Sequence, residues 1–240
     1  MSWMLVGVAA IAAFGAFAQM ITGFGFALVG IPLLALLTDP LTAVVGLTML
    51  SAALTVGAAA HQRHLVDWGE TRAVTLAALI GLPTGLVVVK VVETRVLSVL
   101  IGIVVLVFTL VLASGMSARG RGVTATAGIV SGALLTSTGM NGPPIVLAFH
   151  AKRMSPASFR ATLQAVFAVQ DVLALAGFAL IGLVGATVWT VTAVGAPAMI
   201  LGWWIGTRVA GRINARRFRH IVLAMLVATA AVSLITGLHG

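Results

Sequence analysis

Two breaks inside long apolar stretches hold the residues best suited to bind a small solute. The first covers 22–32 (Thr-Gly-Phe-Gly-Phe-Ala-Leu-Val-Gly-Ile-Pro) and the second 137–144 (Ser-Thr-Gly-Met-Asn-Gly-Pro-Pro). Gly lowers helix propensity, and Pro lacks an N–H and clashes with the preceding turn, so both runs predict a helix that stops and restarts. The N-terminus of the restarted helix offers N–H groups and a positive dipole end to an anion. Two breaks could therefore build an anion site without a buried lysine or arginine.

The backbone and side chains of both breaks are the predicted substrate site. Their glycines would let a solute approach the backbone closely, while Thr22, Thr138 and Asn141 would add side-chain donors. The predicted substrate-binding residues are Thr22, Gly23, Phe24, Gly25, Phe26, Thr138, Gly139, Met140, Asn141, Gly142 and Pro143. The alternative is that these glycines are packing notches or kinks, which are common in membrane helices. Because the two breaks occupy equivalent places in the chain, we favour a functional site.

The segment 157–182 carries the ionisable side chain that is costliest to bury. One helical face, at positions i, i+4, i+7 and i+11, carries Arg160, Gln164, Phe167 and Asp171. An ionisable group at membrane depth costs roughly 3 kcal/mol or more and marks a functional candidate. We expect Asp171 to carry a proton or to couple a cation. The alternative is a structural carboxylate that caps a broken helix or bonds a threonine.

A milder polar stripe lies in the segment 41–60. An offset of 116 residues pairs the polar face of the segment 157–182, the first stripe, with Val44, Thr48, Ser51 and Thr55, the second stripe. Both stripes should face the interior. Gln19, three residues before the first break, is a weaker candidate. The predicted coupling or pathway-lining residues are Gln19, Thr48, Ser51, Arg160, Gln164, Gln170 and Asp171.

Other chemistries are poorly supported. The chain has no Cys, which excludes disulfides and thiol catalysis. His61 and His64 form a His-x-x-His pair, but no third ligand is suitably placed, so we predict a solvated loop and no metal or cofactor. An intramembrane enzyme would need a nucleophile–base pair or paired acids at depth, and only Asp171 lies clearly there. We therefore expect that the protein is not an enzyme.

Composition indicates what must position these residues. The chain has 240 residues, 60% of them hydrophobic and 8% charged, against about 25% charged in soluble domains. Crossing the roughly 30 Å hydrocarbon core takes about 20 apolar residues in a helix. The apolar segments are 3–37, 41–60, 71–89, 96–114, 122–149, 157–182, 187–207 and 218–238. We predict a single all-α domain, a polytopic transmembrane helix bundle of about 8–10 membrane segments. The bundle would contact membrane lipid, and the sequence is compatible with either a monomer or a homo-oligomer.

The two halves of the chain match weakly but in order. With an offset of 116, Thr22-Gly23 falls on Thr138-Gly139, and Pro40 falls on Pro156. With an offset of 121, the pair Gly81/Gly85 falls on Gly202/Gly206, and these glycines are read as helix-packing notches. We predict repeats of about 1–116 and 120–240, divided in the loop 114–122. Each begins with a broken hairpin, either full-length or re-entrant.

The basic residues then predict the topology. The formal charge of +9 suggests orientation by loop charges rather than nucleic-acid binding. If each broken segment is a hairpin, Lys90 and Arg95 lie on one side and the other twelve of 14 basic residues lie opposite, including the run 208–220. The positive-inside rule favours this arrangement over single crossings. The repeats are then inverted, with both termini outside the plasma (cell inner) membrane.

The break residues also carry a family resemblance. The stretch 22–32, followed by Leu-Leu-Ala-Leu-Leu, resembles the first-repeat signature of the TauE/SafE family of sulfite exporters. The stretch 138–144, followed by Ile-Val-Leu and by Ser-Pro-Ala-Ser-Phe-Arg at 155–160, resembles its second signature. The stretches 64–68 and 81–85 resemble further family patterns. The family often has glycines where Met140 and Asn141 stand here, which leaves the substrate open.

The resemblance implies bacterial inner-membrane transport of small sulfur-containing anions such as sulfite, sulfoacetate or other organosulfonates. The working mechanism is alternating access, with the two repeats rocking around a shared pocket and export coupled to an ion gradient. A passive anion channel, or a transporter of another small organic anion, is the alternative.

Overall fold

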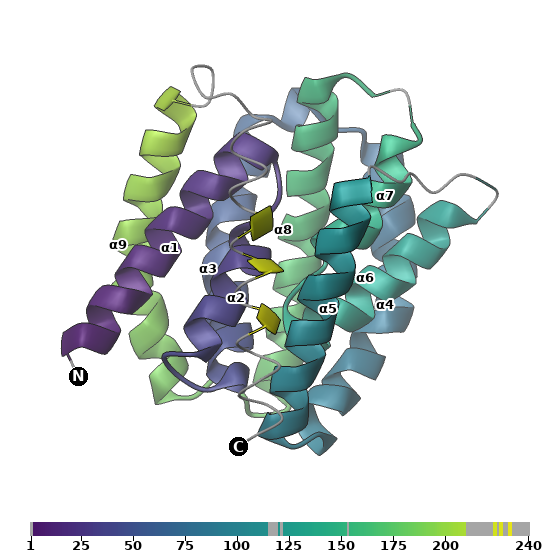
Figure 1. Cartoon of the computed structure of the whole chain (residues 1–240). Coiled ribbons are helices and arrows are strands. Elements are labelled where there is room, and N and C mark those ends of the chain that lie inside the picture. The colour runs from purple at the N-terminus through teal and green to yellow at the C-terminus, as the bar shows by residue number, and fades with distance from the viewer. Residues whose placement is uncertain are drawn as a thin grey trace.

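The computed structural model describes residues 2–114, 120, 122–152, 154–209 and six positions between 223 and 231, and in these residues the chain is helical. The helices are α1 (Ser2–Thr22), α2 (Phe26–Ala35), α3 (Pro40–His61), the 3₁₀ helix η1 (Arg63–Leu65), α4 (Trp68–Val91), α5 (Thr94–Ser114), α6 (Val123–Thr138), α7 (Gly142–His150), α8 (Pro156–Leu180) and α9 (Ala186–Val209). Figure 1 shows them gathered into one bundle.

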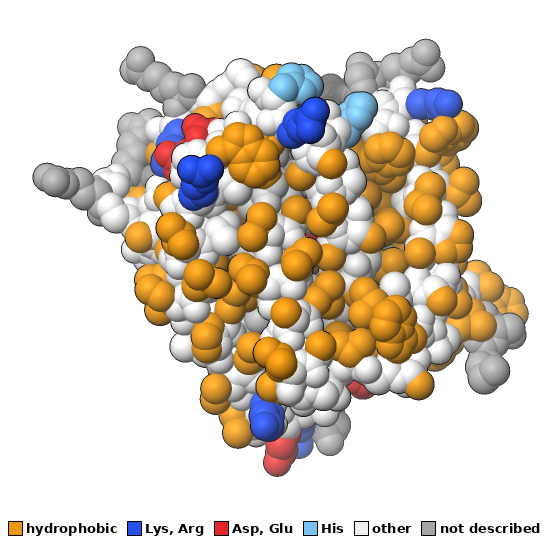
Figure 2. Space-filling view, turned by 180° about the vertical axis from the view of Figure 1, so that it is seen from behind, with side chains coloured by type: hydrophobic (Ala, Val, Ile, Leu, Met, Phe, Trp, Pro, Cys, Tyr) orange, Lys and Arg blue, Asp and Glu red, His pale blue; other side chains and the backbone are white. Residues whose placement is uncertain are grey.

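Six of the described helices, α1, α3, α4, α5, α8 and α9, are long and apolar enough to cross a membrane. On the face shown in Figure 2, hydrophobic side chains cover the middle, and charged side chains gather towards the upper and lower ends. This distribution is that of a polytopic membrane bundle, which confirms the predicted fold class.

Both predicted breaks are present. Helix α1 ends at Thr22 and α2 begins at Phe26, while α6 ends at Thr138 and α7 begins at Gly142. Gly23 has a φ of 84° and Gly139 a φ of 73°, in the left-handed region that side chains other than glycine rarely adopt. The glycines therefore end each first helix at its predicted place.

In each broken segment the second helix is the shorter one. Helix α2 has 10 residues and α7 has 9, so each extends about 15 Å or less at 1.5 Å per residue. Helix α1 has 21 residues and α6 has 16. The returning arm of each hairpin is thus about half as long as a membrane-spanning helix.

The two central helices begin in the same way. The Asp39 side chain accepts a hydrogen bond from Thr42 N–H at 2.9 Å, and Pro40 opens α3. The Ser155 hydroxyl accepts from Ser158 N–H at 3.1 Å, and Pro156 opens α8. Each is an N-cap followed by proline at the first helical position, a strong start signal. Residues 116 positions apart, Asp39 and Ser155, therefore cap the two helices in the same way.

The long helices pack in a reciprocal pattern, with α1 along α9, α6 along α4, and α3 against α8. Glycines set the distance in both outer pairs. A Cβ on Gly81 would lie 1.9 Å from the Ile129 carbonyl oxygen, and one on Gly202 would lie 1.9 Å from that of Ala13. The prediction that these glycines are packing notches is confirmed. Ala13 and Ile129 are again 116 positions apart, while the division of the chain into two repeats stays a prediction.

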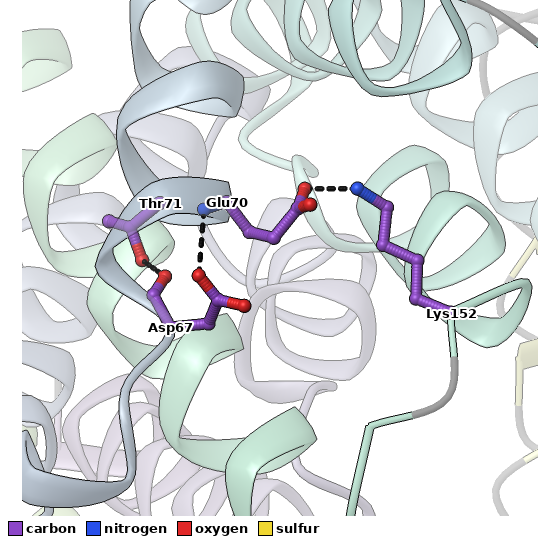
Figure 3. Close-up of polar contacts among 4 residues, drawn as sticks. All are labelled: Asp67, Glu70, Thr71 and Lys152. Carbon is purple, nitrogen blue, oxygen red and sulfur yellow. Dashed lines mark hydrogen bonds and ion pairs between the residues drawn. The ribbon is translucent and has the colours of Figure 1, made fainter.

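At one end of the bundle, an ion pair joins α4 to the segment after α7 (Figure 3). Glu70, in the first turn of α4, pairs with Lys152, and Asp67 caps the same helix by accepting from Glu70 N–H at 3.0 Å. His61 ends α3, and Arg63 and His64 lie in η1; all three are exposed, as predicted, but they are helical where the sequence predicts a loop. Lys90 and Arg95 lie at the junction of α4 and α5, at the other end of α4.

Several predictions concern positions outside the described residues. These are most of the repeat boundary at 114–122, most of the last apolar segment at 218–238, and the basic residues Arg119, Arg121, Arg153, Arg212, Arg216, Arg217 and Arg219. The sidedness of the chain in the membrane stays a prediction.

Candidate functional site

The two breaks meet in one small cavity. A Cβ on Gly142, at the start of α7, would lie 3.7 Å from the Cβ of Phe24 in the first break. The cavity has a volume of about 20 Å³, room for about one water molecule. An organic anion could enter only if the breaks moved apart. The lining residues are Gln19, Phe24, Gly25, Ala27, Leu28, Ser51, Met140, Asn141, Gly142, Pro143 and Phe167.

Two glutamines hold the first break in place. Gln19 Oε1 accepts a hydrogen bond from Phe26 N–H, in the first turn of α2, at 3.0 Å. Gln19 Nε2 donates to Gln164 Oε1 on α8 at 3.1 Å, and Gln164 Nε2 donates to the Gly23 carbonyl oxygen at 3.1 Å. Because unpaired backbone groups are costly at membrane depth, these amides make the break tolerable.

A second amide chain braces the other break. Asn141 Nδ2 donates to Gln170 Oε1 on α8 at 3.1 Å, and Gln170 Nε2 donates to Ser131 Oγ on α6 at 3.0 Å. Ser131 is absent from the predicted set. Its signal is spacing, because it lies seven residues before Thr138 and hence near the same helical face. Helix α8 thus supports the first break through Gln164 and the second through Gln170.

Four of the predicted binding residues take structural positions in this conformation. The hydroxyls of Thr22 and Thr138 donate to the carbonyl oxygens of Ala18 and Leu134, both at 2.9 Å. Phe26 is fully buried, and a Cβ on Gly139 would meet the Ile31 side chain at 2.2 Å. None of the four lines the cavity, and neither does Gly23. The other six predicted residues, Phe24, Gly25, Met140, Asn141, Gly142 and Pro143, all do.

Asp171 is buried where the two polar stripes meet. Ser51 Oγ, on α3, donates to Asp171 Oδ2 at 2.7 Å, and Thr55 Oγ1 lies 3.4 Å from the same oxygen. The side chain is 1% exposed, and no ion pair to it is recorded among the described residues. This environment fits a proton-carrying carboxyl group, and it fits the structural alternative, a carboxylate bonded to hydroxyls, equally well.

The two stripes face the interior with one exception. Thr48, Ser51, Thr55, Gln164 and Asp171 are all buried, and Thr48 donates to the Val44 carbonyl oxygen at 2.7 Å. Arg160 is exposed instead. It lies in the first turns of α8, where a long cationic side chain can reach the membrane surface, and its aliphatic stem packs near Gly23. Arg160 therefore does not line the interior in this conformation.

The cavity offers hydrogen bonds but no positive charge. Its polar side chains are Gln19, Ser51 and Asn141, and the first-turn N–H groups of α2 and α7 lie beside it. Pro143 and Pro144 lack N–H groups, so α7 supplies fewer backbone donors than α2. Neutral donors and two helix N-termini form an environment suited to a small anion.

Comparisons with known proteins agree with this architecture. The model of the family described as "Sulfite exporter TauE/SafE" matches residues 8–233. A curated protein of Cupriavidus necator, named "Probable sulfite/organosulfonate exporter TauE", is 28% identical over an alignment that covers 95% of this chain and 92% of the relative. No solved structure matches the chain. Since the family model matches nearly the whole chain, this protein belongs to the TauE/SafE sulfite exporter family of membrane transporters.

Proposed function

We propose that this chain exports small sulfur-containing anions, such as sulfite, sulfoacetate or other organosulfonates, through the cavity where its two breaks meet. The observation that carries this proposal is the convergence of Phe24 and Gly25 with Asn141 and Gly142 around one cavity lined by neutral donors. The family and the name of its Cupriavidus necator relative supply the substrate class.

The proposed mechanism is alternating access. The cavity holds about one water, so it corresponds to a closed state between the two open ones. The reciprocal packing of α1 on α9 and α4 on α6 ties each predicted repeat to the other, which suits rocking about a shared centre. In the open states, the anion would bind the N–H groups of α2 and α7 and the Asn141 amide.

Coupling to an ion gradient is assigned to Asp171. Its carboxyl group is buried between α3 and α8, and it accepts a hydrogen bond from Ser51, which lines the cavity. A carboxyl group at that place can take up a proton from one side and release it to the other. We also propose that the chain works in the bacterial inner membrane, with both termini outside, and that it catalyses no chemical reaction.

Reconstituted protein tests the function. Proteoliposomes loaded with sulfite or an organosulfonate should release it with saturable kinetics, and a pH gradient should change the rate. Asp171→Asn should remove that dependence, whereas Thr190→Ala, on an exposed part of α9, should leave it unchanged. Flux that rises linearly with concentration would favour the channel. Undiminished transport driven by a pH gradient in the Asp171 variant would remove its coupling role.

A further inference from the structure

Ser51 lies between the cavity and the Asp171 carboxyl group. It lines the cavity, and its hydroxyl donates to Asp171 Oδ2 at 2.7 Å. Asp171 is not among the lining residues and is 1% exposed. Ser51 is therefore the side chain through which a change at Asp171 can reach a bound solute.

The Ser51 hydroxyl has one proton to donate. Thr55 also approaches Asp171 Oδ2, at 3.4 Å, but its shorter hydrogen bond, at 2.8 Å, goes to the Ser51 carbonyl oxygen. Ser51 is thus the principal donor to Asp171. An ionised carboxylate accepts hydrogen bonds and donates none, so while Asp171 is ionised the Ser51 proton is committed to it. Ser51 can then turn only lone pairs towards the cavity, which disfavours an anion there.

Protonation of Asp171 reverses this arrangement. The proton stays on the carboxyl group, whose O–H can donate to Ser51 Oγ. The Ser51 hydroxyl is then free to rotate and to donate its own proton to an anion in the cavity. Because no lysine or arginine is among the lining residues, one added donor is a large share of the available interactions.

We infer that Ser51 is a hydrogen-bond switch, through which a proton at Asp171 and an anion in the cavity favour each other's binding. Linkage makes the effect reciprocal, so the anion strengthens proton binding by the same factor. The proton and the anion then cross the membrane in the same direction, so the anion's own outward gradient drives export and an inward proton gradient opposes it. This inference rests on the proposed function, because it takes the cavity to be the anion site.

The surroundings of Asp171 hold no competing ionisable group among the described residues. The helices packed against α8 include α3, α4, α6, α7 and η1. Their ionisable residues lie at helix ends or in η1, whereas Asp171 is near the middle of α8. These residues are His61, Arg63, His64, Glu70, Arg72, Lys90 and His150. Arg160, on α8 itself, lies about three turns away and is exposed.

Equilibrium binding of methanesulfonate to the purified protein tests the switch. This probe stays ionised across the physiological pH range, so a pH effect on its affinity reports on the protein. The wild type should bind methanesulfonate at least about tenfold more tightly in mildly acidic than in mildly alkaline buffer. This ratio corresponds to the free energy of one hydrogen bond to a charged group. Asp171→Asn should hold the tight affinity at both pH values, because its amide donates to Ser51 without titrating.

Substitutions of Ser51 separate the switch from a structural role. Ser51→Ala should lower the acidic affinity about tenfold and remove most of the pH effect. Ser51→Thr, which keeps a hydroxyl, should retain both. Thr55→Val is the matched control, since it removes the other hydroxyl near Asp171 but none from the cavity lining, and it should keep the pH effect.

Failure of the inference differs from failure of the proposed function. If the wild type binds no sulfonate, both fall. If it binds but Ser51→Ala keeps the full pH effect, the switch is wrong and the proposed function stands. In proteoliposomes, outward sulfonate flow should carry protons outward and make the lumen alkaline, and acidification of the lumen would overturn the switch.

Discussion

Gln164 Nε2 on α8 donates a hydrogen bond to the Gly23 carbonyl oxygen at 3.1 Å, although the two residues are 141 positions apart. The bond joins the first break to the second half of the chain. Gln164 Oε1 accepts from Gln19, which in turn accepts from the first turn of α2. The local shape of the first break therefore depends on a helix from the other predicted repeat.

Gln164→Leu tests this support. The substitution removes a buried donor and acceptor together and leaves Gly23 and Gln19 without their partner. We expect the free energy of unfolding in detergent to fall by about 1–3 kcal/mol and the rate of transport to fall with it. Thermal unfolding and sulfonate efflux measure the two effects. Val169→Ala is the control, because that side chain is 39% exposed on the same helix. Equal stability of the two variants would show that the amide chain contributes nothing.

Gly81→Ala and Gly202→Ala test the packing of the two predicted repeats. Either added Cβ would lie 1.9 Å from a backbone oxygen of the neighbouring helix, so that helix must move. We expect each variant to lose about 1–3 kcal/mol or more of stability. Gly57→Ala is the matched control, since nothing lies within 4 Å of the added atom. It should be neutral or stabilising by up to about 1 kcal/mol, because Ala favours a helix. Thermal unfolding measures all three.

Glu70→Gln tests the ion pair in Figure 3. The side chains of Lys152 and Glu70 are 31% and 25% exposed, so water and salt screen their attraction. We expect a loss of less than about 1 kcal/mol that shrinks as salt is added. Exchange of the two charges in the Glu70→Lys/Lys152→Glu double variant should recover part of the loss. A large effect that does not depend on salt would contradict this account.

Asn141→Asp tests the charge of the bound solute. The substitution nearly preserves size and places a carboxylate on the cavity lining. An anionic substrate should then bind about tenfold or more weakly, since like charges disfavour each other in a water-poor site. Asn141→Ala should have a smaller effect. The measurement is the concentration dependence of sulfonate efflux, and unchanged or tighter binding in the Asp variant would exclude an anion at this position.

Much of the fold follows from residue patterns. Gly23 and Gly139 end their helices because few other residues adopt a positive φ, and Asp39-Pro40 and Ser155-Pro156 are local start signals. Such features act within a few residues, so the sequence alone predicts them. The packing glycines Gly81 and Gly202 were predictable for a related reason, because their spacing recurs in the second half.

The candidate site is less predictable because its contacts join distant residues. The seven-residue spacing of Ser131 from Thr138 places it near the same helical face, but its role depends on Gln170 reaching it from another helix. Thr22 and Thr138 look like free donors, but each hydroxyl bonds a carbonyl one turn back. The pairing of Ser51 with Asp171 likewise needs the packing of α3 on α8.

The central claim is that both breaks form one anion site, and sulfonate binding to variants that fill the cavity from each side tests it most directly. Ala27→Leu enlarges a lining side chain of the first break, Gly142→Val does so in the second, and Ala73→Leu, on the exposed face of α4, is the control. We predict that each cavity variant weakens binding at least about tenfold while the control binds normally. Wild-type affinity in either cavity variant, with the protein folded, would contradict a site shared by the two breaks.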